Sequence, residues 1–207
     1  MSRSVVVVSG GLRVPSTTRL LADQLGRAAE QALSASSVSP TYPVRVETVE
    51  VRDHAHAIVD ALLTGFPTGE LSAALEAVRS ADALILVTPT FQASFSGLFK
   101  SFLDLIEEGQ LRGMPVLLAA TGGTERHSLT IEYALRPLVA HLGAISVPTG
   151  VFAATGDLGG AAAPGLTARI SRAAAELAGM VQGGPVVAPA RDEWTDPTPF
   201  AELLGGA

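Results

Sequence analysis

The chain contains no cysteine, which excludes a disulfide framework, thiolate metal sites and cysteine nucleophiles. Basic residues are in the minority, because 14 lysines and arginines are set against 20 aspartates and glutamates, leaving a net charge of −6. No basic stripe is present to neutralise the phosphates of a nucleic acid, so no nucleic-acid partner is expected. The 207 residues suit one domain with a sizeable core.

Long apolar runs are missing as well. The first run, 5–8, is too short for the apolar part of a secretion signal, and no run approaches the length that spans a bilayer. We therefore expect a soluble cytoplasmic protein with no membrane partner. No metal site is expected either, because no further ligand cluster supports the Asp-His-Ala-His sequence at 53–56.

Apolar runs and helical patterns alternate along most of the chain. The run at 5–8 is apolar throughout, as in a strand buried on both faces, whereas 44–51 alternates as at a sheet edge. Pro89 is expected to end the third strand, because proline cannot donate to a ladder. The predicted strands are 5–8, 44–51, 83–87, 116–120 and 147–152, and the predicted helices are 17–33, 71–78, 97–107, 128–142 and 166–181, with one helical turn around 58–63 inside a loop at 52–68.

Repeated strand–helix units predict parallel strands, right-handed crossovers and helices on both faces of the sheet. We therefore predict an α/β, flavodoxin-like three-layer sandwich with a five-stranded parallel sheet, built from residues 1–182. In such folds the ligand lies beyond the carboxyl ends of the strands, where the strand order reverses. Residues 183–207 lie outside the alternation and are expected to be a disordered tail or an arm that contacts another subunit.

The end of the first strand indicates a phosphate site. A turn at 9–11 is followed by three adjacent hydroxyl side chains, Ser16, Thr17 and Thr18, at the expected start of a helix. A helix N-terminus presents unpaired N–H groups and partial positive charge to an anion. The turn lacks the G-x-G-x-x-G spacing of a dinucleotide site and a Walker-type glycine and lysine, which disfavours a nucleoside-triphosphate enzyme. The hydroxyls favour a monophosphate, with a simple helix cap as the alternative.

The ends of the third and fourth strands, 88–97 and 121–127, suit a flat ring. Pro89 stiffens the strand exit, the backbone N–H groups beyond it can face ring carbonyls and nitrogens, and Phe91 supplies an apolar edge. The paired glycines Gly122 and Gly123 permit the backbone to approach such a ring closely. Taken alone, 88–97 is better explained as an ordinary strand-to-helix turn with buried phenylalanines.

Three motifs resemble the NAD(P)H-dependent FMN reductase family, in particular the flavin reductases of two-component monooxygenase systems of the alkanesulfonate-utilisation type. They are 9–18, the block from 89 to 104, and 120–127 together with 131–137. The similarity extends over about 5–180. The second and third motifs together are specific, whereas the first alone indicates only a phosphate site.

The resemblance implies a flavodoxin-like fold, with FMN bound at the three strand ends. It also implies hydride transfer from NADPH or NADH to flavin N5, without a catalytic side chain from the protein. The cofactor-binding residues that it implies are Ser9, Arg13, Ser16, Thr17 and Thr18 around the phosphate, and Pro89, Thr90, Phe91, Gln92, Thr121, Gly122 and Gly123 around the isoalloxazine.

Pro137 lies inside the fourth predicted helix and lacks the N–H that would pair with the Tyr133 carbonyl. The helix is therefore expected to kink or bulge there. In the reductases that this motif resembles, the tyrosine lies on such a bulge at a subunit interface. Tyr133 is thus a candidate for contacts in a homodimer or homotetramer and for control of flavin release, the alternative being a surface tyrosine without a role.

The leading hypothesis is an enzyme that reduces FMN with NAD(P)H and hands the reduced flavin to a separate monooxygenase. Two alternatives stay open: an FMN-bound reductase of quinones or azo compounds, and a non-enzymatic flavodoxin-like electron carrier. The motif at 121–127 and the proline-broken helix favour the first over the carrier, and nothing in the sequence separates the first two. Arg13 and Arg126 are candidates for contacting the ribose phosphate of NADPH, because arginine suits phosphate geometry.

Overall fold

Strands and helices alternate along the chain in a computed structural model, which describes residues 3–35, 43–158 and 164–183. The elements are β1 (Arg3–Ser9), α1 (Thr17–Ala35), β2 (Val44–Glu50), η1 (Val51–His54), α2 (Ala55–Thr64), α3 (Gly69–Arg79), β3 (Ala83–Phe91), β4 (Ser94–Phe95), α4 (Gly97–Leu103), β5 (Pro115–Gly122), η2 (Glu125–His127), η3 (Ile131–Leu135), α5 (Arg136–His141), β6 (Ile145–Ser146), β7 (Val151–Ala154), η4 (Thr155–Asp157) and α6 (Pro164–Gly183).

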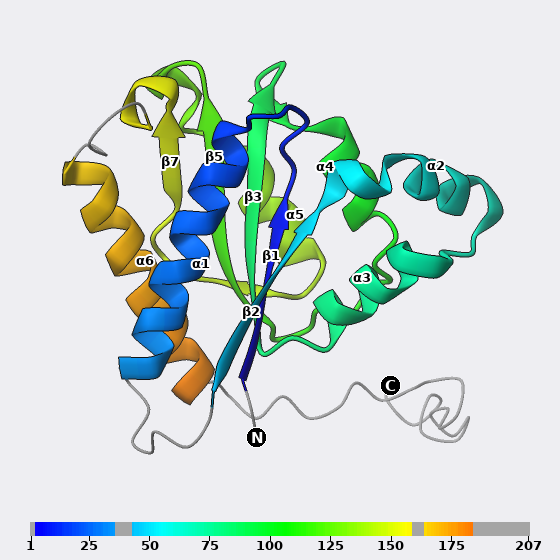
Figure 1. The fold of residues 1–207 in the computed structure, drawn as a ribbon, viewed down its shortest axis with the longest axis horizontal. Helices are drawn as coiled ribbons and strands as arrows, with labels where there is room; N and C mark the ends of the chain where they lie inside the picture. The colour runs from blue at the N-terminus through cyan, green and yellow to red at the C-terminus, as the bar shows by residue number, and fades with distance from the viewer. Residues whose placement is uncertain (1–2, 36–42, 159–163, 184–207) are drawn as a thin grey trace, which may run out of the picture.

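A parallel sheet forms the middle layer of the molecule (Figure 1). Its strands follow the order β2-β1-β3-β5, and β6 and β7 both pair with β5. With β6 and β7 taken as one interrupted strand, this is the 2-1-3-4-5 order of flavodoxin-like folds. The order reverses between β1 and β3, whose carboxyl ends point to the upper edge of the sheet in Figure 1.

Alternate residues of the central strands fill two separate cores. On one face, Val5 and Val7 pack in one cluster with Leu21 and Leu25 of α1 and with residues of α6. On the other face, Val6 and Val8 belong to a cluster that includes residues of α2, α3 and α4. A strand that is covered on both faces has no polar side to show, which explains the uninterrupted valines of β1 and confirms the three-layer prediction.

The segment 52–68 is more helical than predicted, since η1 and α2 together cover 51–64. Within α2, only Ile58 and Ala61 are buried, while Val59 and Leu63 are exposed. Apolar side chains on both faces blur the helical period, so the pattern indicated a single turn. The third predicted helix is shorter than expected, because α4 ends at Leu103 and the chain continues in tight turns.

The last predicted strand, 147–152, overlaps the strands of the structure only at 151–152, because β6 ends at Ser146 and β7 begins at Val151. Between β6 and β7 lies Pro148, which has no N–H for a ladder. The Val147 N–H still donates to the carbonyl of Val116 at 2.9 Å, so the chain stays beside β5 across the break.

The prediction that β3 ends at 88–90 is wrong. The strand passes through Pro89, which pairs with Thr121 of β5, and runs on to Phe91. The ladder with β1 ends two residues earlier, at Ser9 and Val87. Beyond that point the described ladder has a partner on one side only, and proline is tolerated in a strand where its nitrogen has no acceptor to meet. The chain then folds back antiparallel as β4.

The predicted bulge before Pro137 is confirmed. Residues 131–135 form the π-helical turn η3, and α5 follows from Arg136. Arg136 fastens this turn to the sheet by donating to the Ser146 hydroxyl at 2.7 Å and to the Val147 carbonyl at 3.0 Å. Its hydrogen bonds to the Glu132 carboxylate hold the pKa of that group below its usual value.

Among the residues that the structure describes, no helix is long and apolar enough to cross a membrane, and no three acidic or histidine side chains gather as metal ligands would. The predicted tail, 183–207, lies outside the described residues except for Gly183, where α6 ends.

Candidate functional site

A cavity of about 410 Å³ opens at the carboxyl ends of β1, β3 and β5, where the three predicted loops meet. Hydroxyl groups, backbone and one aromatic ring make up most of its wall. The lining residues are Leu12, Arg13, Pro15, Ser16, Thr17, Thr18, Pro89, Thr90, Phe91, Thr121, Gly122, Gly123 and Thr155.

Most of the predicted site residues meet here, and two of them do not line the cavity. Ser9 is fully buried at the end of β1, and Gln92 is exposed at the tip of the β3–β4 hairpin. The sequence analysis missed Leu12, Pro15 and Thr155. Thr155 follows the apolar run of β7 just as the other site residues follow their strands, so the same strand-then-turn signal could have found it.

Residues 10–16, called the phosphate loop after the ligand group predicted for it, join β1 to α1. Ser16 caps the helix, because its Oγ accepts from the Arg19 N–H at 3.2 Å and its carbonyl from the Leu20 N–H at 3.1 Å. A Cβ on Gly11 would lie 2.2 Å from the Ser16 Oγ, so the cap requires glycine there. The first N–H groups of α1 lack acceptors within the helix and carry its partial positive charge, which suits an anion.

Thr18 has a structural partner. Its hydroxyl lies 2.8 Å from that of Thr121, and both side chains are buried. This hydrogen bond ties the first turn of α1 to the end of β5. It therefore sets the distance between the phosphate loop and the third loop, while Thr17 remains exposed at the cavity.

The second loop is a β-hairpin with a strained tip. Its two turn residues, Gln92 and Ala93, have φ of 48° and 65°, as in a type I′ turn. Residues with a Cβ pay on the order of 1 kcal/mol each for this conformation. At the hairpin base, the buried Thr88 hydroxyl accepts from the Ser96 N–H at 3.0 Å. The hairpin places Phe91 and Thr90 at the cavity, and the buried Thr90 Oγ1 has no partner within the described structure.

The two glycines of the third loop have different reasons to be glycine. A Cβ on Gly122 would come within 2.9 Å of the Phe152 ring, so internal packing requires its absence. A Cβ on Gly123 would meet no protein atom within 4 Å. Of the pair, Gly123 is therefore the residue that leaves open backbone facing a ligand.

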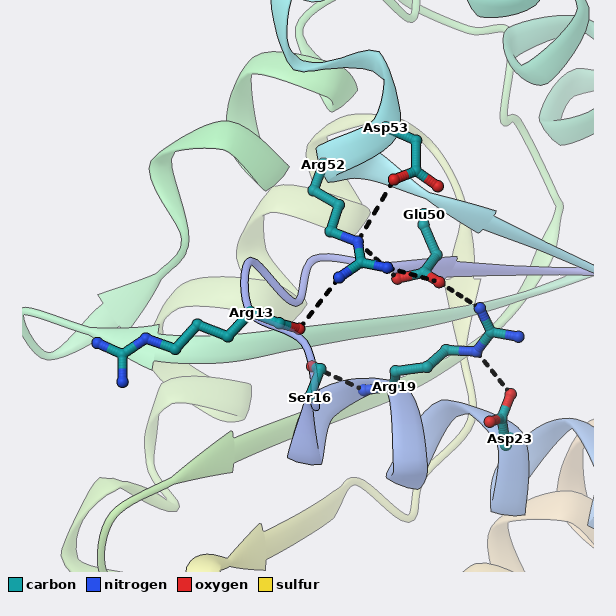
Figure 2. Close-up of polar contacts among 7 residues, drawn as sticks. All are labelled: Arg13, Ser16, Arg19, Asp23, Glu50, Arg52 and Asp53. Carbon is teal, nitrogen blue, oxygen red and sulfur yellow. Dashed lines mark hydrogen bonds and ion pairs between the residues drawn. The ribbon is translucent and has the colours of Figure 1, made fainter.

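Arg13 carries the only charge among the described residues that line the cavity. Its side chain is exposed and extends away from Arg52 and Glu50 (Figure 2). Arg126 lies instead on a second groove, of about 390 Å³, which Ala93, His127 and Tyr133 also line. The structure thus separates the two arginines that the sequence offered as phosphate contacts.

This arrangement suits a ligand with an anionic group at one end and a flat ring at the other. The anion would meet Arg13 and the start of α1, and the ring would lie between Phe91 and Gly123. No carboxylate or histidine of the described chain lines the cavity. Its walls can therefore bind and orient a ligand but offer no side-chain acid or base of that kind.

Known proteins resemble this chain closely. The model of a family described as NADPH-dependent FMN reductase matches residues 3–159. An FMN reductase (NADPH) of Pseudomonas aeruginosa is 40% identical over 182 residues, 87% of this chain and 92% of the relative. The NADH-dependent FMN reductase SfnF of Pseudomonas putida is 40% identical over 149 residues, 72% of this chain and 76% of the relative. The solved structure of an oxidoreductase from Corynebacterium diphtheriae matches with a TM-score of 0.81 at 41% identity. The match covers 87% of this chain and 97% of that protein's chain.

Thr18→Val should lower the free energy of unfolding by about 1–3 kcal/mol, because it leaves the buried Thr121 hydroxyl unpaired. Denaturant unfolding followed by circular dichroism measures the loss. The matched control is Thr17→Val on the exposed neighbour, where a change below about 0.5 kcal/mol is expected. Equal losses in the two variants would contradict the structural role of Thr18.

Proposed function

This chain belongs to the NADPH-dependent FMN reductase family, and from that premise we propose that it reduces FMN with a nicotinamide nucleotide and releases the reduced flavin to a separate monooxygenase. The cavity at the three strand ends carries the proposal, because it joins an anion site to an open, ring-sized wall. The motif resemblance supports the monooxygenase partner, and both this partner and the cytoplasmic location stay predictions.

The lining residues fit FMN by their chemistry. Arg13, Thr17 and the first N–H groups of α1 would hold the phosphate, as charged and neutral donors do at other helix N-termini. Phe91 and Gly123 would contact the isoalloxazine, and the buried Thr90 hydroxyl would gain the partner that it lacks in the protein. The bound flavin supplies the hydride-accepting chemistry, and the protein supplies binding and orientation.

The character of the site supports a flavin that leaves. Phe91 is 45% exposed, and a single arginine stands at the phosphate end. Hydroxyl and backbone donors make hydrogen bonds to the phosphate, and among the described lining residues only Arg13 can add an ion pair to them. Such a site favours exchange of oxidised for reduced flavin over permanent retention.

Two alternatives make different demands. A quinone or azo reductase would keep its FMN and pass electrons to a second acceptor, and an electron carrier would have no nicotinamide reaction. Two relatives at equal identity are named as nicotinamide-dependent FMN reductases, one for NADPH and one for NADH, which favours the reductase over the carrier. Both nucleotides therefore belong in the test.

Purified apo-protein should oxidise NADPH or NADH at a rate that rises and saturates with added free FMN. The absorbance of the reduced nicotinamide follows the reaction, which is run without oxygen and without any quinone. In a separate assay with a quinone added, turnover by FMN-loaded protein in the absence of free FMN would support the first alternative. Absence of nicotinamide oxidation under all conditions would support the carrier.

Gly123→Ala should raise the KM for FMN about tenfold or more, because its methyl would occupy the place proposed for the ring. The fold should tolerate the methyl, since it meets no protein atom within 4 Å. The control is Gly179→Ala on α6, an equally open position outside the cavity, which should leave the KM for FMN unchanged. An unchanged KM in Gly123→Ala would refute the placement of the ring.

We further propose that Tyr133 contacts another copy of the chain. It lies on η3 with 79% of its surface exposed, beside Leu129, which is 59% exposed. Two large apolar side chains one turn apart suit the centre of an interface better than they suit solvent. The interface would lie on the groove next to the hairpin, close enough to the cavity to affect flavin release.

Tyr133→Ala should shift the protein toward smaller assemblies and speed FMN release, as read by light scattering and stopped-flow flavin fluorescence. The matched control is Phe66→Ala, which removes an aromatic ring that is 77% exposed beyond the end of α2. If Tyr133→Ala changes neither the mass nor the release rate, Tyr133 is a surface residue without this role.

A further inference from the structure

Charged side chains gather beside the phosphate loop, and one carboxylate stands at their centre (Figure 2). Glu50 is the last residue of the edge strand β2, and its side chain is only 12% exposed. Its Oε1 accepts from the Arg19 Nη1 at 2.5 Å and from the Arg52 Nη2 at 3.4 Å. Its Oε2 forms an ion pair with the Arg52 Nε at 3.2 Å, without a hydrogen bond. Glu50 therefore holds two guanidinium groups, one from α1 and one from η1.

Both arginines also belong to the contacts of the phosphate loop. Arg52 donates from Nη1 to the backbone carbonyl of Arg13 at 3.1 Å. Arg19 donates its main-chain N–H to the Ser16 Oγ at the end of the loop. The backbone of Arg13 is thus held while its side chain remains free of the cluster and extends away from it (Figure 2).

Two further carboxylates, Asp23 and Asp53, pair with the same two arginines and are more exposed than Glu50. Asp23 accepts from the Arg19 Nε at 2.7 Å, and Asp53 lies 3.4 Å from the Arg52 Nε. These side chains are 38% and 62% exposed, so solvent screens them far more than it screens Glu50. A carboxylate that is largely removed from water is strongly bound to its cationic partners, because leaving either side unpaired is costly.

We propose that Glu50 is a positioning residue, which fixes the phosphate loop through Arg52 and Arg19 and thereby sets the preference for FMN over riboflavin. A loop that is already ordered loses less conformational freedom when it binds a phosphate. Riboflavin has no phosphate and gains nothing from this ordering. The inference rests on the proposed function, because it takes the loop as the site of the flavin phosphate.

The direction in which the affinity for FMN changes distinguishes a positioning role of Glu50 from a purely electrostatic one. Glu50 is an anion near a site for an anion, so removing its charge should strengthen FMN binding if the electric field alone matters. Positioning predicts the opposite, because Arg52 would turn to Asp53 and release the Arg13 carbonyl. Riboflavin serves as the internal reference for both cases.

Glu50→Gln should weaken FMN binding about tenfold or more and change riboflavin binding less than about twofold, as measured by quenching of flavin fluorescence on apo-protein. The KM for FMN should rise in parallel while kcat is kept. Arg52→Lys should show the same selective loss, because an ammonium cannot bind Glu50 and the Arg13 carbonyl as a fork does. The control is Glu76→Gln, which breaks the pair with Arg79 on α3 and should change neither affinity.

Tighter FMN binding in Glu50→Gln would overturn the proposal in favour of a pure charge effect. Equal weakening of FMN and riboflavin, or no change in either, would overturn it as well. If Glu50→Gln does not fold, Arg52→Lys decides alone because it keeps the charge: selective loss of FMN affinity supports positioning, and unchanged affinity overturns it. Failure of the proposed function would appear differently, as wild-type protein that binds flavin but oxidises neither NADPH nor NADH.

Discussion

Burial of β1 between β2 and β3 is the constraint from which the rest of the molecule follows. Both of its edges are paired and both of its faces are packed, so the strand itself offers no surface to a ligand. The loop after its carboxyl end does. There the strand order reverses, and the connections run to opposite sides. The reversal brings the phosphate loop beside the ends of β3 and β5. A cavity at this place is thus a product of topology, and its chemistry depends on the three loops.

In the proposed site, these loops divide the binding of the flavin among them. The first provides N–H groups and Arg13, the hairpin provides Phe91 and an unpaired hydroxyl, and the third provides open backbone at Gly123. Other residues of the same region have structural roles. The Thr18 hydroxyl is hydrogen-bonded to that of Thr121, and Gly122 leaves space for the Phe152 ring. A site of this kind provides position and leaves the redox chemistry to the flavin, as expected of a reductase whose flavin carries the reaction.

Charge is arranged in two tiers around the phosphate loop. Among the charged side chains that the structure describes, only Arg13 lines the cavity. Arg19 and Arg52 contact the loop at the Ser16 cap and the Arg13 carbonyl, and Glu50 binds both of these arginines. The second tier lies at the end of an edge strand, where side chains have space to form a network. Sequence spacing gave no sign of it, because Glu50 and Arg19 are brought together only by the pairing of β2 with β1.

By itself, the sequence determined the layer order, the buried strands, the bulge before Pro137 and the loops that form the site, because each depends on local periodicity or on the chemistry of one residue. Only the tertiary structure decided the rest. Pro89 continues its strand because β1 stops pairing at Val87, and the hairpin adopts positive φ at Gln92 without a glycine to announce it. The tertiary structure also buries Ser9, packs the Phe152 ring against Gly122 and pairs Glu50 with two arginines. Each depends on a neighbour distant in the chain, which local patterns do not encode.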